Sequence, residues 1–171
     1  MTEIFPGRWT AQLTAKPESS GEDADVVLFL IGMRVNKLWR LDQYLWIGLA
    51  MVRMLAYLAK HPEAGMIRAH NWFGRTTMQV GYWRSLADLV AFAAEESQPH
   101  QPAWRRYYRT ASRSGAVGVW HETYLIRAGQ VESIYANMPR FGLAEAAEHV
   151  RVDRGTSSAR QRVRRSGSTG S

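Results

Sequence analysis

Cysteine is absent from the 171-residue chain, which excludes disulfide bonds, thiolate nucleophiles and zinc or iron–sulfur centres built from cysteine. His and carboxylate side chains are the protein ligands that remain for a metal. The sequence also has no Gly-rich phosphate loop, no dinucleotide fingerprint, no HExxH pair and no Gly-x-Ser-x-Gly elbow. The familiar classes of nucleotide-binding protein, metalloprotease and serine hydrolase therefore find no support.

Long uncharged apolar runs are lacking as well. The two most apolar stretches, 26–35 and 38–58, are interrupted by charged residues such as Arg40 and Arg53, so neither reaches the roughly 20 residues that cross a bilayer. Residues 1–10 do not combine a basic segment with an apolar core, as a secretory signal does. We therefore expect a cytoplasmic protein with no membrane partner.

The formal net charge of +7 is concentrated at one end of the chain. Residues 151–171 hold six arginines and one aspartate, which is +5, so the first 150 residues carry only +2. This segment is rich in Ser and Gly and offers few apolar side chains, a composition typical of disorder. We expect a disordered tail without a specific nucleic-acid partner, whose deletion from Gly155 onwards leaves folding intact. Weak attraction to anionic surfaces is the alternative.

Hydrophobic periodicity predicts a mixture of strands and helices. Residues 26–35 are apolar at both alternating parities, as in a strand covered on two faces, whereas Leu41, Leu45 and Leu49 recur at helical spacing. Ser85 and Asp88 have the spacing of a capping box at the start of a second helix. The expected elements are strands at 8–14, 26–35, 65–73, 75–83, 115–126 and 131–138, with helices at 41–61, 86–96 and 103–113.

This order is βαββαβ with an extra strand, which is typical of a ferredoxin-like α+β fold, an antiparallel sheet with helices on one face. We expect an N-terminal extension with a mobile loop (1–24), a ferredoxin-like domain (25–150) and the tail (151–171). A single unit of this kind leaves one sheet face bare, although residues 26–35 are apolar on both sides. A second copy would cover that face, so we expect a homodimer.

Polar residues set among aromatic ones on the strands are the functional candidates. His121 shares its parity with Val119 and Leu125, so it should face an apolar layer, with the adjacent Glu122 on the opposite face. A neutral imidazole in such a place can act as a general base or ligate a metal. It can equally be a core histidine that is satisfied by a backbone carbonyl.

The predicted hairpin supplies a second group of candidates. Asn71 and Arg75 lie on either side of Gly74 and can orient an oxygenated substrate, although turn residues also serve only to satisfy the turn backbone. Large aromatic side chains can line a flat pocket or simply pack in a core or an interface. The aromatic candidates for substrate contact are Trp72, Tyr82, Trp83, Trp104 and Trp120.

The same residues resemble a family of small bacterial and fungal monooxygenase-like proteins that are related to the antibiotic-biosynthesis monooxygenases. The resemblance covers roughly residues 7–14 and 25–143. It implies a dimeric α+β barrel, and in the wider superfamily cofactor-free oxygenases act on polyketide-like aromatic substrates through Asn, Trp, Tyr and Arg side chains. Asn71, Trp72 and Arg75 are similar to these in type only. The motifs that carry the resemblance are VLFLIGMRVN (27–36), YWRS (82–85), WHETY (120–124) and YANMPRFGL (135–143).

A second resemblance is to haem-containing aldoxime dehydratases, carried by WRSLADL (83–89), the His121-Glu122 pair and Tyr135-x-Asn137. It implies that His121 is the proximal ligand of a haem, held non-covalently because the chain has no c-type attachment motif, and that Asn137 contacts the substrate. Those enzymes follow the Tyr-x-Asn segment with a catalytic histidine, where this chain has Met138-Pro139. This departure counts against aldoxime dehydration itself.

We expect a homodimeric monooxygenase-like enzyme that acts on a small hydrophobic, natural-product-type substrate in a tailoring pathway. Either no cofactor or a non-covalent haem accompanies this function. A haem enzyme of the aldoxime dehydratase type is one alternative. A non-catalytic barrel that only binds a small ligand is another, because a fold does not determine a function.

Overall fold

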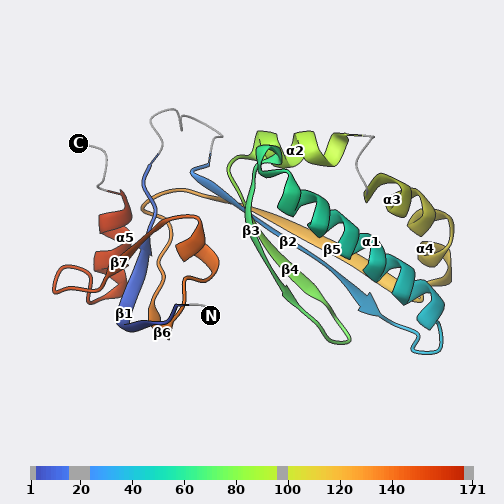
Figure 1. The fold of residues 1–171 in the computed structure, drawn as a ribbon, viewed down its shortest axis with the longest axis horizontal. Helices are drawn as coiled ribbons and strands as arrows, with labels where there is room; N and C mark the ends of the chain where they lie inside the picture. The colour runs from blue at the N-terminus through green and yellow to red at the C-terminus, as the bar shows by residue number, and fades with distance from the viewer. Residues whose placement is uncertain (1–2, 16–23, 96–99, 168–171) are drawn as a thin grey trace.

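The computed structural model describes residues 3–15, 24–95 and 100–167. Its strands form two antiparallel sheets, one of four strands and one of three (Figure 1). The strands are β1 (Phe5–Gln12), β2 (Val26–Val35), β3 (Met66–Trp72), β4 (Met78–Trp83), β5 (Val117–Ile126), β6 (Tyr135–Met138) and β7 (Glu148–Arg151). The helices are α1 (Leu41–Lys60), α2 (Leu86–Ala94), α3 (His100–Arg109), α4 (Ala111–Ser114) and α5 (Ala159–Gly167), with short 3-10 turns η1 (Pro62–Ala64) and η2 (Gly142–Glu145).

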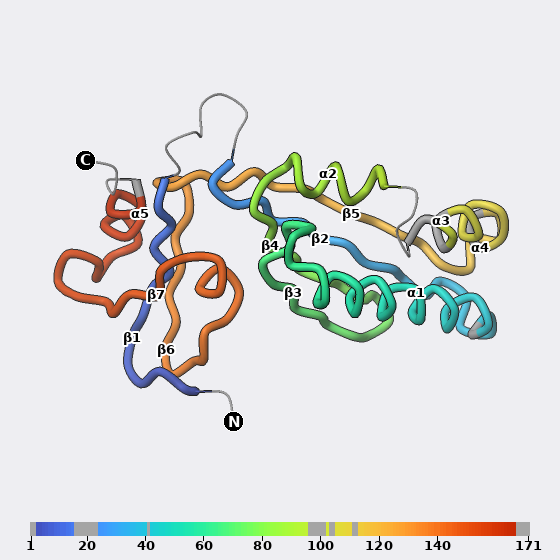
Figure 2. Tube along the Cα trace, turned by 45° about the horizontal axis from the view of Figure 1, so that its top comes forward, coloured from blue at the N-terminus to red at the C-terminus, as the bar shows by residue number. Residues whose placement is uncertain are grey.

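The four-stranded sheet has the order β3-β4-β2-β5, and all its neighbours are antiparallel. With α1 between β2 and β3 and α2 after β4, this is the βαββαβ arrangement of the ferredoxin-like fold. The prediction of a ferredoxin-like α+β unit is therefore confirmed. The three-stranded sheet stands at one end of this unit, and α3 and α4 lie at the other end (Figure 2).

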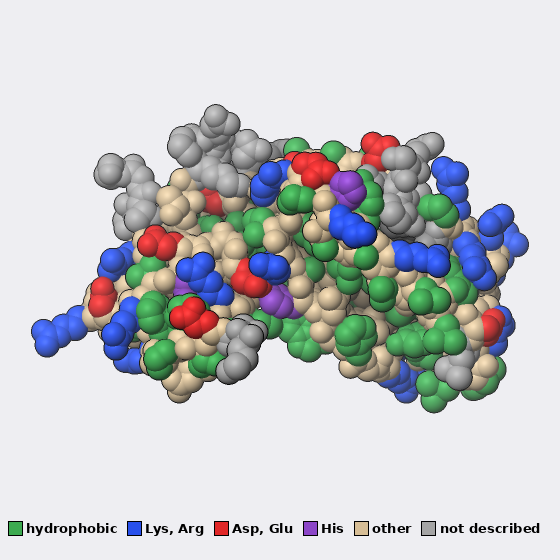
Figure 3. All heavy atoms as spheres, in the orientation of Figure 1, with side chains coloured by type: hydrophobic (Ala, Val, Ile, Leu, Met, Phe, Trp, Pro, Cys, Tyr) green, Lys and Arg blue, Asp and Glu red, His purple; other side chains and the backbone are tan. Residues whose placement is uncertain are grey.

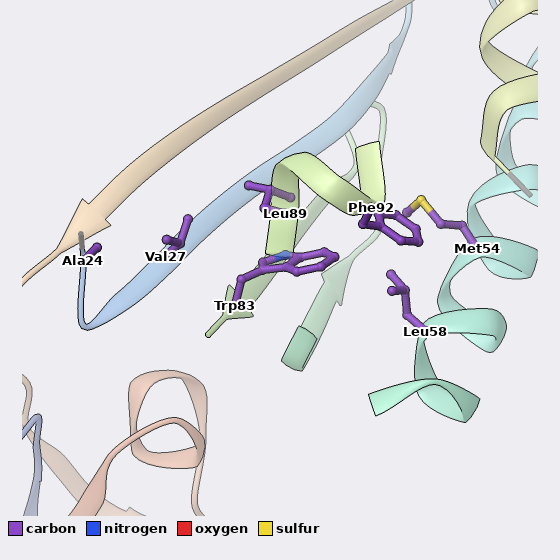
Figure 4. Close-up of a cluster of buried hydrophobic side chains, with 7 residues drawn as sticks. All are labelled: Ala24, Val27, Met54, Leu58, Trp83, Leu89 and Phe92. Carbon is purple, nitrogen blue, oxygen red and sulfur yellow. The ribbon is translucent and has the colours of Figure 1, made fainter. Parts of the chain in front are cut away.

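Strand β2 is central because it pairs with β4 along one edge and with β5 along the other. Val27 and Ile31 face α1 and α2, and Val26 is buried on the opposite side. The main core joins this strand to both helices, with Leu58 from α1, Leu89 from α2 and Trp83 from β4 in one cluster (Figure 4). Below, the sheet side that carries Val27 is called the helix face, and the other side the open face.

Helix α2 begins where its sequence predicts. The Ser85 hydroxyl accepts a hydrogen bond of 3.0 Å from the backbone N–H of Asp88, which satisfies one of the unpaired donors of the first turn. The acidic Asp88 also suits the positive end of the helix dipole. Because α2 starts directly after β4, this cap fixes the helix over the end of β4 that holds Trp83.

The second sheet was only partly predicted. The expected extra strand at 131–138 is shorter, and β6 pairs with β1 rather than with the ferredoxin-like sheet. Strand β7 was not predicted, and it pairs with the other edge of β1. The N-terminal segment is therefore the middle strand of a sheet, whereas the predicted mobile loop falls largely on residues 16–23, outside the described residues.

The predicted disorder of the tail is corrected over residues 151–167. This stretch contains the end of β7 and helix α5, with Thr156, Arg162 and Ser166 buried. The guanidinium of Arg162 pairs with the carboxylate of Glu132 and donates to the carbonyl oxygen of Thr156 at 3.0 Å. The segment offers few apolar anchors, but the ion pair between buried Arg162 and the partly exposed Glu132, thirty positions earlier, fixes it.

Turn η2 joins the two sheets. The backbone N–H of Gly142 donates to Nε2 of His70 on β3 at 3.1 Å, and Nε of Arg68 lies 3.1 Å from the carboxylate of Glu145. The ring of Phe141 lies against that of His70, with centroids 4.1 Å apart. Polar and aromatic contacts therefore hold the three-stranded sheet to the outer edge of the larger one.

A buried histidine lies in the three-stranded sheet. His149 is 8% exposed, and among the described residues neither ring nitrogen has a hydrogen-bond partner. Its ring packs against those of Phe5 and Trp9, with centroids 4.8 and 5.0 Å apart. Burial, with a smaller contribution from the positive charge of Arg140, lowers the pKa of His149 below its ordinary 6.5.

This environment predicts that acid destabilises the protein through His149. As the pH falls below about 6.5 the unfolded chain takes up the proton before the folded protein does, so the free energy of unfolding falls. The contribution is fully present above pH 6.5, and the expected slope below it is at most about 1.4 kcal/mol per pH unit. Urea unfolding of the wild type and of His149→Phe between pH 5 and 8 gives the free energy of unfolding of each protein against pH. The difference between these two curves measures the contribution of His149. Parallel curves would contradict the prediction.

Candidate functional site

A pocket of about 400 Å³ opens on the helix face, between α1, α2 and the sheet. We call it the α1–α2 pocket. Its volume lies in the range of small-molecule sites, and a mostly apolar wall with few polar groups is typical of such sites. Two strands contribute its polar groups, Gln79 from β4 and His121 and Thr123 from β5. The apolar wall includes Phe29, Ile31, Met54, Leu58, Leu89 and Phe92.

His121 lies on the helix face, as its parity predicts. It is paired in register with Ile31 of β2, and its ring centroid is 5.8 Å from that of Phe29. The side chain is exposed into the pocket, and no described residue hydrogen-bonds the imidazole. These are not the features of a satisfied core histidine. Glu122 is on the open face, where it accepts a hydrogen bond of 2.6 Å from the hydroxyl of Tyr124.

Two buried polar atoms in the pocket wall lack partners among the described residues. They are Oε1 of Gln79, an acceptor, and Nε1 of Trp83, a donor. Both side chains are almost completely buried, and an unsatisfied buried polar atom costs about 1–3 kcal/mol. Gly81, between them on β4, leaves room for the indole, because a Cβ there would lie 3.2 Å from Nε1. A ligand with both a donor and an acceptor would satisfy the pair.

A smaller pocket of about 240 Å³ lies on the other side of α1, against the β3–β4 hairpin. We call it the α1–hairpin pocket. It shares Ile31 and Gln79 with the α1–α2 pocket, so the two cavities are neighbours over the same part of the sheet. Asn71 and Trp72, two of the predicted site residues, line it and are both exposed.

Arg75 and Asn137 have structural contacts outside both pockets. Nε of Arg75 donates to the backbone oxygen of Val35 at 3.2 Å, which ties the hairpin to β2. Oδ1 of Asn137 accepts from the backbone N–H of Gly7 at 2.9 Å in the three-stranded sheet, and Asn137 itself has a positive φ of 52°. Asn tolerates that left-handed conformation better than most residues do. Turn chemistry explains both residues.

Tyr82 and Trp120 lie on the open face, across the sheet from His121. Burial raises the pKa of the Tyr82 phenol, which packs beside Gly142. Nε1 of Trp120 is buried without a partner among the described residues and lies over Gly32 of β2, where a Cβ would come within 2.8 Å of it. The side chain of Trp104 lies outside the described residues.

The predicted site residues therefore separate into distinct places. Among those whose side chains are described, only His121 and Trp83 meet in the α1–α2 pocket. Gln79 and Thr123 complete it and were not predicted. Gln79 shares the parity of Trp83, so a polar residue within that buried series on β4 was the signal that could have identified it. Asn71 and Arg75 are four positions apart in sequence, yet Asn71 lines the α1–hairpin pocket and Arg75 holds the hairpin to β2.

The residues of the α1–α2 pocket do not fit a haem. A ligating histidine ordinarily donates its second ring N–H to a protein acceptor, and His121 has no such partner among the described residues. The described wall of the pocket also has no Lys or Arg that could pair with two propionates. Elsewhere in the described part of the chain, no group of three or more His, Asp or Glu converges as metal ligands.

The fold has counterparts of known structure. The aldoxime dehydratase OxdRE, crystallised with butyraldoxime, superposes with a TM-score of 0.63 at 16% identity, over 85% of this chain and 43% of that chain. A second aldoxime dehydratase gives a TM-score of 0.58 at 17% identity, over 80% and 43% of the two chains. At these identities the likeness concerns the fold alone. No described helix is both long enough and apolar enough to span a membrane.

Sequence comparison identifies the family. Monooxygenase af470 of Aspergillus fumigatus is 27% identical in an alignment 151 residues long that covers 80% of this chain and 53% of that protein. The chain thus spans about half the length of this curated relative. The model of the monooxygenase af470-like family matches residues 26–143, from the start of β2 to turn η2. Because this match covers well over half of its residues, the chain belongs to the monooxygenase af470-like family.

Proposed function

We propose that the protein is a monooxygenase that binds a hydrophobic, natural-product-type small molecule in the α1–α2 pocket. One observation carries this proposal: an imidazole and two buried polar atoms, all three without a hydrogen-bond partner among the described residues, share one apolar cavity. Such a combination is typical of a substrate site, where a few polar groups orient a largely apolar ligand. Membership of the af470-like family supports the choice of oxygenation as the reaction.

The pocket chemistry suggests which kind of substrate fits. An apolar body of aromatic or terpenoid type would lie against Phe29, Ile31 and Leu89, and a hydroxyl or enol head would donate to Gln79 and accept from Trp83. That head would satisfy both buried atoms at once, which favours the correct ligand over one that lacks the group.

His121 is the base in the reaction that we propose. The imidazole removes a proton from an acidified CH₂ group of the substrate, and the resulting carbanion gives electrons to O₂. One oxygen atom ends as a carbonyl on that carbon and the other leaves as water, so CH₂ and O₂ become C=O and H₂O. The substrate supplies all the electrons, and neither a haem nor another reductant enters the balance.

Oxygen consumption tests this function directly. The purified protein is incubated with hydroxylated polycyclic aromatic compounds that have an acidic CH₂ group, under ¹⁸O₂, with an oxygen electrode and mass spectrometry as readouts. Uptake of O₂ and one labelled oxygen in the product are expected. Tight binding of such a compound without O₂ uptake would identify the protein as a non-catalytic ligand-binding barrel instead. No binding would reject the site.

Gln79 offers a test that separates function from stability. The Gln79→Leu variant removes a buried acceptor without a partner, so we expect stability to rise by about 1 kcal/mol while substrate turnover falls about tenfold or more. Gln43→Leu is the matched control, because Oε1 of buried Gln43 accepts a hydrogen bond of 2.8 Å from the Ser114 hydroxyl. Loss of that hydrogen bond should destabilise the protein. Thermal melts and turnover rates give both quantities. A destabilised Gln79→Leu would show that this amide is structural.

A homodimer built on the open face belongs to the same proposal. Leu28, Leu30 and Val80 lie there only partly covered, and Tyr124 is exposed. Apolar sheet surface left in water is costly at about 25 cal/mol per Å². We expect sedimentation equilibrium to give twice the 19.4 kDa of one chain and Leu30→Arg to give the monomer, with Val90→Arg on α2 as the unaffected control. A wild-type monomer at micromolar concentration would overturn this assembly.

A further inference from the structure

We propose that the outward side of α1, together with the loop before it and the tip of the β3–β4 hairpin, docks on an anionic lipid surface. The first observation is the composition of α1, whose twenty residues include only three charged side chains, Asp42, Arg53 and Lys60. A helix that is apolar nearly all round is ordinarily buried on all sides. Among the described residues, the side toward the sheet is covered by contacts such as those of Met54 and Leu58, and α3 meets the helix at Trp46. The side between these contacts is exposed.

The uncovered side of α1 carries a continuous apolar stripe. Leu45, Leu49 and Val52 are spaced at one helical turn and are 60%, 57% and 59% exposed. The stripe continues at the tip of the hairpin in Phe73, which is 82% exposed, and before the helix in Trp39, which is 78% exposed. An apolar patch of this kind marks a surface that meets another apolar phase. Figure 3 shows hydrophobic side chains gathered over this end of the molecule.

Basic residues predominate in the segments that carry and adjoin the stripe. In residues 34–53, 72–78 and 105–113 the acidic side chains amount to Asp42 alone, and it is paired with Arg40 at 2.9 Å. The guanidinium of Arg106 on α3 lies over the Trp46 ring of α1 at 4.4 Å, so the basic α3–α4 end adjoins the helix. The basic residues of these segments are Arg34, Lys37, Arg40, Arg53, Arg75, Arg105, Arg106, Arg109 and Arg113.

This charge distinguishes between two occupants of the surface. In a two-fold dimer the same patch meets its own copy, which would bring these basic groups against each other. An anionic lipid surface is complementary to them, and basic groups near such a surface strengthen its binding. Protruding Trp and Phe side chains suit the headgroup region, which adapts its shape to them. A lipid surface therefore satisfies the apolar stripe and the charge together.

Docking in this orientation would place the mouth of a cavity at the lipid. Leu45, Leu49, Val52 and Phe73 belong to the stripe and also line the α1–hairpin pocket. A hydrophobic molecule dissolved in the bilayer could enter that pocket without crossing water. The sequence predicts no membrane partner because no spanning segment exists, but surface docking needs none. The docking itself does not rest on the proposed oxygenation.

Vesicle flotation of the full chain tests the proposal. We expect the protein to float with vesicles of phosphatidylcholine and phosphatidylserine and to remain behind with pure phosphatidylcholine. Leu49→Glu and Trp39→Ser should each weaken binding about tenfold, because each removes an apolar side chain from the contact. Ile134→Glu is the matched control, since Ile134 is an exposed apolar residue outside the stripe and its substitution should leave binding unchanged.

Three results would overturn the proposal. The first is no flotation with the anionic vesicles, and the second is equal flotation with both kinds. The third is a wild-type dimer that Leu49→Glu converts to a monomer, which would assign this face to a second copy. All these side chains are exposed, so the melting temperatures of the variants should match that of the wild type. If the protein proves not to be an oxygenase, the flotation test still applies, because it measures membrane binding and requires no turnover.

Discussion

Replacing His121 with alanine is expected to lower turnover by about 10²–10⁴-fold, the usual contribution of a positioned general base. The melting temperature should change little, because the imidazole is exposed into the α1–α2 pocket and no described residue hydrogen-bonds it. The rate loss should appear in kcat rather than in KM, since the base acts on a substrate that is already bound. Steady-state oxygen uptake with the wild type and the variant measures both constants.

Two further variants make this result specific. His61→Ala removes a surface imidazole that lies 2.6 Å from the carboxylate of Glu63, outside the pocket, and should keep wild-type turnover. Thr123→Val changes a pocket residue that is not proposed to take up a proton, so its effect should fall mainly on KM. Undiminished turnover in His121→Ala would remove this residue from the site. The α1–hairpin pocket, with Asn71 and Trp72, would then be the better candidate.

Replacing Arg162 with methionine is expected to lower the free energy of unfolding by about 3 kcal/mol, the lower end of the range for a broken buried ion pair. The lower end applies because the side chain of Glu132 is 27% exposed and part of its charge can return to water. Two backbone acceptors, the carbonyl oxygens of Thr156 and Ser157, also lose their donor. For a chain of this size the melting temperature should fall by roughly 10 °C.

Arg160→Met is the matched control, since it removes the same charge from an exposed position on α5 and should change stability by less than about 0.5 kcal/mol. Deleting the chain from Gly155 onwards should destabilise it at least as much as Arg162→Met. Urea unfolding of the three proteins gives the comparison. If the truncated protein is as stable as the wild type, α5 contributes nothing to the fold.

The ferredoxin-like unit was predictable because its elements are long and periodic. Strand β2 is apolar on both parities, α1 repeats its leucines at helical spacing, and Ser85 marks the start of α2. The second sheet could not be predicted in the same way, because β7 has only four residues and pairs with β1, at the opposite end of the sequence. Short strands that pair over such distances leave little local pattern.

The α1–α2 pocket shows the same division. Strand parity placed His121 on the correct face, since alternation is a property of any regular strand. It did not reveal that α1 and α2 leave a cavity between them, because that depends on how the helices pack. The basic tail illustrates the opposite error: composition indicates disorder on average, whereas one buried arginine, Arg162, docks α5 through its ion pair with Glu132.

The position of β1 in its sheet has a consequence for synthesis of the chain. The four-stranded sheet has all its strands once residue 126 has left the ribosome, whereas β1 pairs with residues 135–138 and 148–151. During translation, β1 therefore emerges first and waits longest, with both of its edges unpaired. Unpaired edges attract other strands, and pairings this distant in sequence form late. Nascent chains that stall between about residues 126 and 150 should be the most prone to aggregate, and a chaperone would be most useful on the ribosome in that interval.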